Sequence, residues 1–155
     1  MKQIFPLAVV FSVVFAFSCN ENHNGHSRDG ESKTRTDSLL NDVMDGHNIG
    51  MAKMGRLTRA EQTTRRLLDS IAKLPVKARQ AAEPLQGKLD SLQKELSYAE
   101  FAMNKWMDEF NVDSAVDNAK DRINYLEEEK LKVTKVKEAI LGSLQKADSL
   151  LKDRI

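Results

Sequence analysis

A regular ladder of apolar residues between positions 85 and 110 constrains the fold more than any other feature of the sequence. Its members are separated by 4, 3, 4, 3, 4, 3 and 4 residues: Leu85, Leu89, Leu92, Leu96, Ala99, Met103, Trp106 and Phe110. This alternation is a heptad seam, typical of an α-helix that buries one narrow face against other helices. Because an isolated helix is marginal in water, the segment predicts partners of the same kind.

Two further segments with helical spacing flank this ladder. The first is predicted to begin at Thr36 or Asp37, either of which is a suitable N-cap, and to run to about Lys73. The last is predicted to run from about Ser114, after a tight corner at 111–114, to Lys152.

The start of the middle helix has two interpretations. Pro84 suits the first position of a helix, which makes 76–83 a connection or a short extra turn. The alternative is one longer helix that is kinked at Pro84.

The apolar positions of the outer two segments define their expected inward faces. In the first segment the inward positions are Leu40, Met44, His47, Met51, Met54, Leu57, Thr64, Leu68 and Ile71. In the last segment they are Val116, Ala119, Ile123, Leu126, Val133, Val136, Ile140, Leu144, Ala147 and Leu151. The charged run at 127–130 is interpreted as part of a solvated face. Gly46, Gly50 and Gly55 are unfavourable in a helix, which indicates that another element approaches the backbone there.

Short connections make sequential helices antiparallel neighbours, so the predicted fold is all-α. We expect an elongated antiparallel three-helix bundle, a long helical hairpin plus a third helix, over residues 37–155. A third helix that outran its partners would leave its last turns free for a second copy of the chain, and a fraying end is the alternative.

The N-terminus has the order of an export signal. A short positive start precedes the uncharged run 4–17, which is short for a membrane-spanning helix, and the run is followed by Ser18 and Cys19. We interpret residues 1–18 as a signal peptide and Cys19, the only cysteine, as the acylated (palmitate-bearing) first residue of a lipoprotein. The alternative is an ordinary secretory signal followed by an accidental cysteine. Residues 20–36 contain no hydrophobic side chain, so 19–36 is predicted to be the lipidated cysteine and a disordered tether.

Charge and residue content exclude several classes of function. Without the signal, 23 basic and 23 acidic residues remain, because Lys2 is the only charge lost from 24 and 23. This balance argues against nucleic-acid binding and against electrostatic attachment to anionic lipid. The only cysteine is assigned to lipid and the folded part has a single histidine, so no catalytic set is apparent and we expect no enzyme activity.

One cluster could carry chemistry. Met44, Met51 and Met54 accompany His47 in the first segment, while Met103 and Met107 flank Trp106 in the second. In an antiparallel hairpin the two stretches lie at similar heights, so we expect His47 and Trp106 to meet. Thioether and imidazole ligands suit Cu(I), and an indole can lie over the ion. The competing interpretation is a methionine-rich core without cofactor, in which His47 bonds to a carbonyl, Asp45 or Asn48. Haem is a less suitable ligand, because no Cys-x-x-Cys-His motif is present and the interior of a three-helix bundle is narrow for a porphyrin.

Residues 44–57, MDGHNIGMAKMGRL, together with 104–110, NKWMDEF, resemble a family of small lipoproteins of Bacteroidetes-type bacteria. Many members carry the automatic description "viral A-type inclusion protein". In that family a Met-x-x-His-x-x-x-Met-x-x-Met-Gly core is similarly paired with Trp-Met-x-x-Phe. Asn48 stands where an acidic residue is common, and Ala52 where proline is common. The resemblance implies an envelope location and a helical architecture; it indicates nothing about activity.

Residues 57–62, LTRAEQ, are also similar to the Leu-Thr-x-x-Gln motif of small periplasmic helical chaperones, with the glutamine one position late.

The sequence therefore predicts a lipid-anchored helical protein of the cell envelope, at the outer membrane and facing the periplasm or the surface. Its expected role is a non-enzymatic structural or interaction module, whose partner is an envelope protein or a second copy. An envelope Cu(I)-binding protein is the alternative, and a chaperone-like protein is the third.

Overall fold

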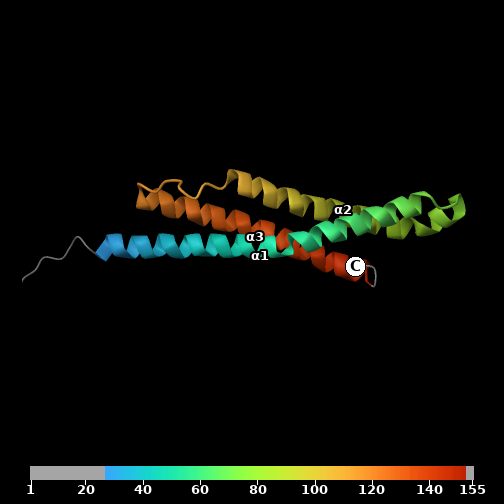
Figure 1. Ribbon diagram of the computed structural model, residues 1–155, viewed down its shortest axis with the longest axis horizontal. Coiled ribbons are helices and arrows are strands. Elements are labelled where there is room, and N and C mark those ends of the chain that lie inside the picture. The colour runs from blue at the N-terminus through green and yellow to red at the C-terminus, as the bar shows by residue number, and fades with distance from the viewer. Residues whose placement is uncertain (1–26, 153–155) are drawn as a thin grey trace, which may run out of the picture.

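The computed structural model describes residues 27–152, and in that range every regular element is a helix (Figure 1). The helices are α1 (Ser27–Ala72), α2 (Val76–Glu109) and α3 (Ala119–Leu150). They run up, down and up, so α2 is antiparallel to both neighbours and each helix packs against the other two. The predicted all-α three-helix bundle is confirmed. The predicted signal peptide, the predicted lipid attachment site Cys19 and residues 20–26 lie outside the described residues.

The helices are staggered, so only the middle of the bundle contains all three (Figure 1). At one end α1 and α3 extend past the end of α2. Toward this end the ion pairs Arg35–Glu127 and Asp42–Lys130 join α1 to α3. At the other end α1 and α2 extend past α3 as a two-helix hairpin. We call residues 43–61, 92–110 and 126–151 the central section, and residues 62–90 the tip section. The last turns of α3 do not extend past their partners, because the α1–α2 hairpin continues beyond them.

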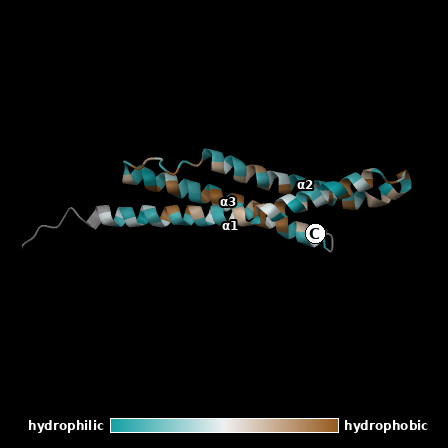
Figure 2. Cartoon of the chain, viewed as in Figure 1, coloured by the Kyte–Doolittle hydropathy of each residue, from teal (hydrophilic) through white to brown (hydrophobic). Residues whose placement is uncertain are grey.

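The core fills the central section and continues into the tip section at Ile71 and Leu89. The heptad positions Leu89 to Trp106 of α2 are buried as predicted, and they meet Val43, Leu57, Val133, Ile140 and Leu144 from the other helices. Figure 2 shows hydrophobic positions recurring between hydrophilic ones along the three helices of the central section. Four residues that were expected to face inward are exposed instead: Leu85, Met51, Val116 and Ala119. Leu85 lies where no third helix covers it, and Val116 lies in a loop.

The start of α1 differs from the prediction. The helix already includes residues 27–36, which were expected to belong to the disordered tether. Thr36, the expected cap, lies inside the helix, where its hydroxyl donates to the Lys33 carbonyl at 2.8 Å. Arg35 is paired with Glu127 of α3. The neighbouring α3 supplies a partner for these turns, and extending an existing helix costs little compared with starting one.

The first residues of α2 and α3 also differ from the prediction. α2 begins at Val76, so Pro84 lies inside the helix and the longer-helix alternative was correct. The segment 76–83 is rich in Ala, Lys, Arg and Gln, which favour helix.

The start of α3 is Ala119, and Ser114 lies in the preceding loop. Asn118 caps the helix, accepting from the backbone N–H groups of Lys120 and Asp121. Ala115 has φ 56°, a left-handed conformation that prevents an earlier start.

Candidate functional site

The predicted meeting of His47 and Trp106 occurs in the central section. The ring centroids of His47 on α1 and Trp106 on α2 lie 5.5 Å apart. The His47 Nδ1 atom is 3.2 Å from the Asn48 Oδ1 atom, one of the partners that the sequence suggested. Trp106 then stacks on Phe110 at 4.8 Å, and Phe110 on Tyr125 at 6.2 Å. A continuous column of rings therefore joins all three helices at this level.

The indole of Trp106 is fixed by a buried carboxylate that the sequence analysis assigned to solvent. Its N–H donates to the Glu129 Oε2 atom at 2.9 Å, while the Lys132 ammonium lies 2.7 Å from Oε1. Glu129 is only 3% exposed. The bond to Glu129 raises the pKa of Lys132, because the carboxylate stabilises the ammonium.

The interpretation of 127–130 as a solvated run was therefore wrong at Glu129. The spacing contained the signal, because the ladder of α3 jumps from Leu126 to Val133, and position 129 fills that gap.

Gly46 and Gly50 let α1 approach its neighbours, as predicted. A Cβ atom at Gly50 would lie 2.4 Å from the Met103 methyl carbon, and one at Gly46 would lie 3.0 Å from a Val133 methyl carbon. Gly55 has no such neighbour on another helix. Close packing at the first two positions places the His47 turn of α1 directly against α2 and α3.

The methionines divide into buried and exposed members. Met103 is fully buried against Gly50, and Met44 and Met54 are partly buried. Met51 and Met107 are exposed. The expectation that Met51 faces the core was therefore wrong. Among residues 27–152 no group of three or more His, Cys, Asp or Glu is placed to hold a metal ion.

A second buried carboxylate, Glu61 of α1, was also missed. It accepts hydrogen bonds from Ser97 Oγ at 2.7 Å and Gln93 Nε2 at 2.8 Å, and it pairs with Arg65. Glu100 lies beside it, and burial, the hydrogen bond to Glu61 and the charge of Glu61 raise the pKa of Glu100. Here too the ladder had a gap, from Leu57 to Thr64.

The segment 57–62 that is similar to a chaperone motif contributes to this interior. Leu57, Ala60 and Glu61 are buried, and the Thr58 hydroxyl donates to the Met54 carbonyl.

An open groove lies between α2 and α3 beside the ring column. We call it the α2–α3 groove; it has a volume of about 330 Å³, and its main lining residues are Tyr98, Phe101, Lys105, Lys132, Lys135 and Val136. Tyr98 is 63% exposed and Phe101 61%. The groove combines large aromatic side chains with cations, whereas the rest of the surface carries alternating charges. No spacing pattern in the sequence distinguished Tyr98 and Phe101 from the residues of the heptad seam.

Comparison of the chain with protein-family models, curated proteins and solved structures finds no match. None of the helices in the described range is long and apolar enough to cross a bilayer.

Proposed function

We propose that this protein is a non-enzymatic interaction module of the cell envelope, held to a membrane by lipid on Cys19, and that the α2–α3 groove is its docking face. The observation that carries the proposal is the pair of exposed aromatic side chains, Tyr98 and Phe101, in that groove. Aromatic residues supply much of the binding energy of protein interfaces.

The shape and charge of the groove indicate the kind of partner. A channel between two roughly antiparallel helices suits a third, amphipathic helix that lays its apolar side onto the aromatic rings. The rim carries three lysines and one acidic residue, Glu109, which is paired with Lys105. The favoured partner is therefore a helical segment of an envelope protein with acidic residues beside its apolar stripe.

The groove has a rigid floor. Trp106 lines it and is held by Glu129, and the same glutamate holds Lys132 on the rim. A docking face that is fixed before binding loses less conformational entropy when the partner arrives.

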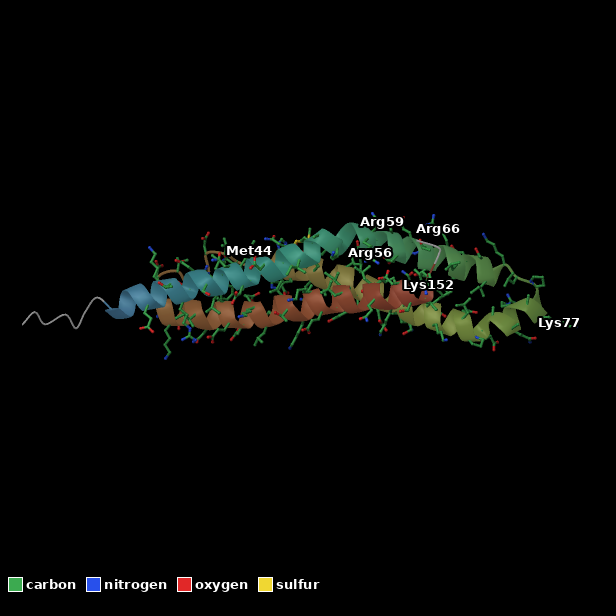
Figure 3. All side chains as sticks on the ribbon, turned by 90° about the horizontal axis from the view of Figure 1, so that it is seen from below. Met44, Arg56, Arg59, Arg66, Lys77 and Lys152 are labelled. Carbon is green, nitrogen blue, oxygen red and sulfur yellow. The ribbon has the colours of Figure 1, made fainter. Side chains whose placement is uncertain are left out.

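Site-specific photocrosslinking in the producing cell tests the docking face. A photoreactive residue in place of Phe101 should give a discrete crosslinked product. The same residue in place of Arg59, which projects from the outer side of α1 (Figure 3), should not. Lys135→Glu, which reverses an exposed charge on the rim and leaves the Glu129–Lys132 pair intact, should weaken the Phe101 product while the protein level stays constant. Equal products at both positions, or none at either, would contradict the proposal.

The anchor is tested separately. Metabolic labelling with a palmitate analogue should label the chain and keep it in membranes washed with high salt, and Cys19→Ser should abolish the label and release the protein from these washed membranes. Attachment of Cys19→Ser that survives the high-salt wash would contradict the lipid anchor without affecting the groove.

A second candidate function is binding of Cu(I) by the methionine cluster. It is supported by the 5.5 Å separation of the His47 and Trp106 rings, and by the exposure of Met51 and Met107, which an incoming ion can reach. Titration with Cu(I) under reducing conditions should quench Trp106 fluorescence with a one-to-one end point. An unchanged response after Met51→Leu and Met103→Leu, or no response at all, would eliminate it.

A further inference from the structure

The turn between α1 and α2 forms a protruding apolar tip. We call residues 70–82 the hairpin tip. Leu74 is 38% exposed and Val76 is 60% exposed, and they flank Pro75 at the extreme end of the molecule. Figure 2 shows hydrophobic positions at this turn, and Figure 3 places Lys77 there. No third helix reaches these residues, so their side chains are directed into solvent.

The hairpin tip is also basic. It contains Lys73, Lys77 and Arg79 and no acidic residue, and the nearest acidic residues in the chain are Asp69 and Glu83. The opposite end of the rod has the reverse charge. Residues 108–121 contain five acidic residues and only one basic residue, Lys120, a balance of 1 − 5 = −4: Asp108, Glu109, Asp113, Asp117 and Asp121. The near-neutral total of the chain therefore conceals two oppositely charged ends.

We propose that the hairpin tip binds an anionic lipid bilayer. Leu74 and Val76 insert at the level of the headgroups, and Lys73, Lys77 and Arg79 contact lipid phosphates. Aliphatic side chains surrounded by cations are the combination that binds anionic membrane surfaces. Because the tip is convex, it needs no shape-matched cavity in its partner, which favours a deformable bilayer over a folded protein.

The distance of the tip from the N-terminal end of α1 indicates what binding of a membrane by the tip would achieve. α1 has 46 residues, which at about 1.5 Å per residue span ~69 Å. Ser27, at the far end of α1 from the tip, is eight residues after Cys19. If Cys19 carries the lipid anchor, the tip lies far from that anchor and reaches a second anionic surface. Tip binding itself requires neither the anchor nor the α2–α3 groove, so it goes beyond the proposed function and can fail independently.

Flotation with lipid vesicles tests the inference. The mature chain with Cys19→Ser, which carries no acyl group, is mixed with vesicles of phosphatidylcholine alone or with one third phosphatidylglycerol. We expect the protein to float with the anionic vesicles, to be released by raised salt, and to remain unbound with pure phosphatidylcholine.

Two pairs of substitutions assign the binding to the tip. Lys73→Gln with Lys77→Gln should lower the partition coefficient onto anionic vesicles ~25-fold, because each lysine removed is expected to lower it about fivefold. Lys53→Gln with Lys94→Gln removes the same charge from exposed positions of the rod and should leave partitioning within about twofold. All four positions are exposed, so the fold is expected to survive, and unchanged Trp106 emission confirms it.

Insertion is measured by a dye. In the Cys19→Ser chain, Leu74→Cys supplies a single thiol for an environment-sensitive fluorophore, and Lys94→Cys supplies the control. The emission should shift to the blue with anionic vesicles at position 74 only. No flotation, equal loss in both glutamine pairs, or an unshifted emission at position 74 would overturn the proposal. If sedimentation shows a dimer that depends on the tip and no vesicles are bound, the proposal is overturned and the partner of the tip is a second copy of the chain.

Discussion

The central section and the tip section are built from the same two helices, α1 and α2, yet they bury their apolar side chains to different extents. In the central section Leu57, Leu96 and Met103 are fully buried. In the tip section Ile71 and Leu89 are buried, but Leu68 is only partly buried and Leu85 is exposed. The ladder of α2 continues through both sections without a break in spacing. The difference teaches that periodicity defines which side of a helix is apolar, whereas the presence of α3 decides whether that side is removed from water.

The same contrast applies to polar groups. The central section contains the buried carboxylates Glu129 and Glu61, each with several donors. The acidic residues of the tip section, such as Asp69 and Glu83, remain exposed. A third helix therefore brings both more hydrophobic burial and more polar groups that need partners, and removal of a partner there is costly.

Matched leucine truncations give the largest expected contrast. Leu96→Ala should lower the free energy of unfolding by about 3 kcal/mol, because it leaves a cavity in a fully packed core. Leu68→Ala should cost about 1 kcal/mol, because part of that side chain is already in water. Urea unfolding followed by circular dichroism measures both. Equal losses would show that the tip section is as well packed as the centre.

Substitution of Glu129 is the next largest effect. Glu129→Ala should destabilise the protein by about 2 kcal/mol, because the buried indole N–H of Trp106 loses its acceptor. Glu129→Gln keeps an acceptor oxygen and should cost about 1 kcal/mol, and the neighbouring exposed Glu128→Ala should stay within about 0.5 kcal/mol. A double-mutant cycle with Trp106→Phe should give a coupling energy of about 1 kcal/mol. A coupling of zero would contradict the assigned bond.

Glycine substitutions should have opposite signs in the two sections. Gly87 of the tip section has open space where a Cβ atom would go, so Gly87→Ala should stabilise the helix by up to about 1 kcal/mol. At Gly50 the added carbon meets Met103 at 2.4 Å, so Gly50→Ala should destabilise by about 1 kcal/mol after the helix gain is subtracted. Thermal unfolding of both variants checks the sign. A stabilised Gly50→Ala would mean that Met103 moves aside freely.

The pH dependence from Glu100 is the smallest expected effect. Its pKa is raised in the folded state, so the folded protein binds this proton more tightly than the unfolded chain. The stabilising contribution is present at pH values below the unfolded pKa and disappears as pH rises through the folded pKa. Glu100→Gln should therefore be slightly more stable than the parent at pH 7, and the difference should vanish in acid. Unfolding curves between pH 7 and pH 4 measure it; a difference that grows in acid would contradict the assignment.

Much of the candidate site followed from spacing alone. The heptad ladder placed Trp106 and Met103 inside, and the antiparallel hairpin brought His47 to the indole without any long-range signal in the sequence. The gap in the ladder between Leu126 and Val133 places Glu129 on the inward side of α3, but the spacing did not show which group the carboxylate meets there. Its burial depends on the level at which α3 meets α2.

The sequence by itself determined three helices, their apolar sides and the glycine-assisted contact of α1 with its neighbours, because these depend on residue type and on the 3.6-residue period. Only the tertiary structure decided the stagger of the helices. The stagger leaves the hairpin tip uncovered and separates the basic end from the acidic end. The physical reason is that stagger depends on side-chain packing between helices, and spacing within one helix does not encode the height at which another helix ends.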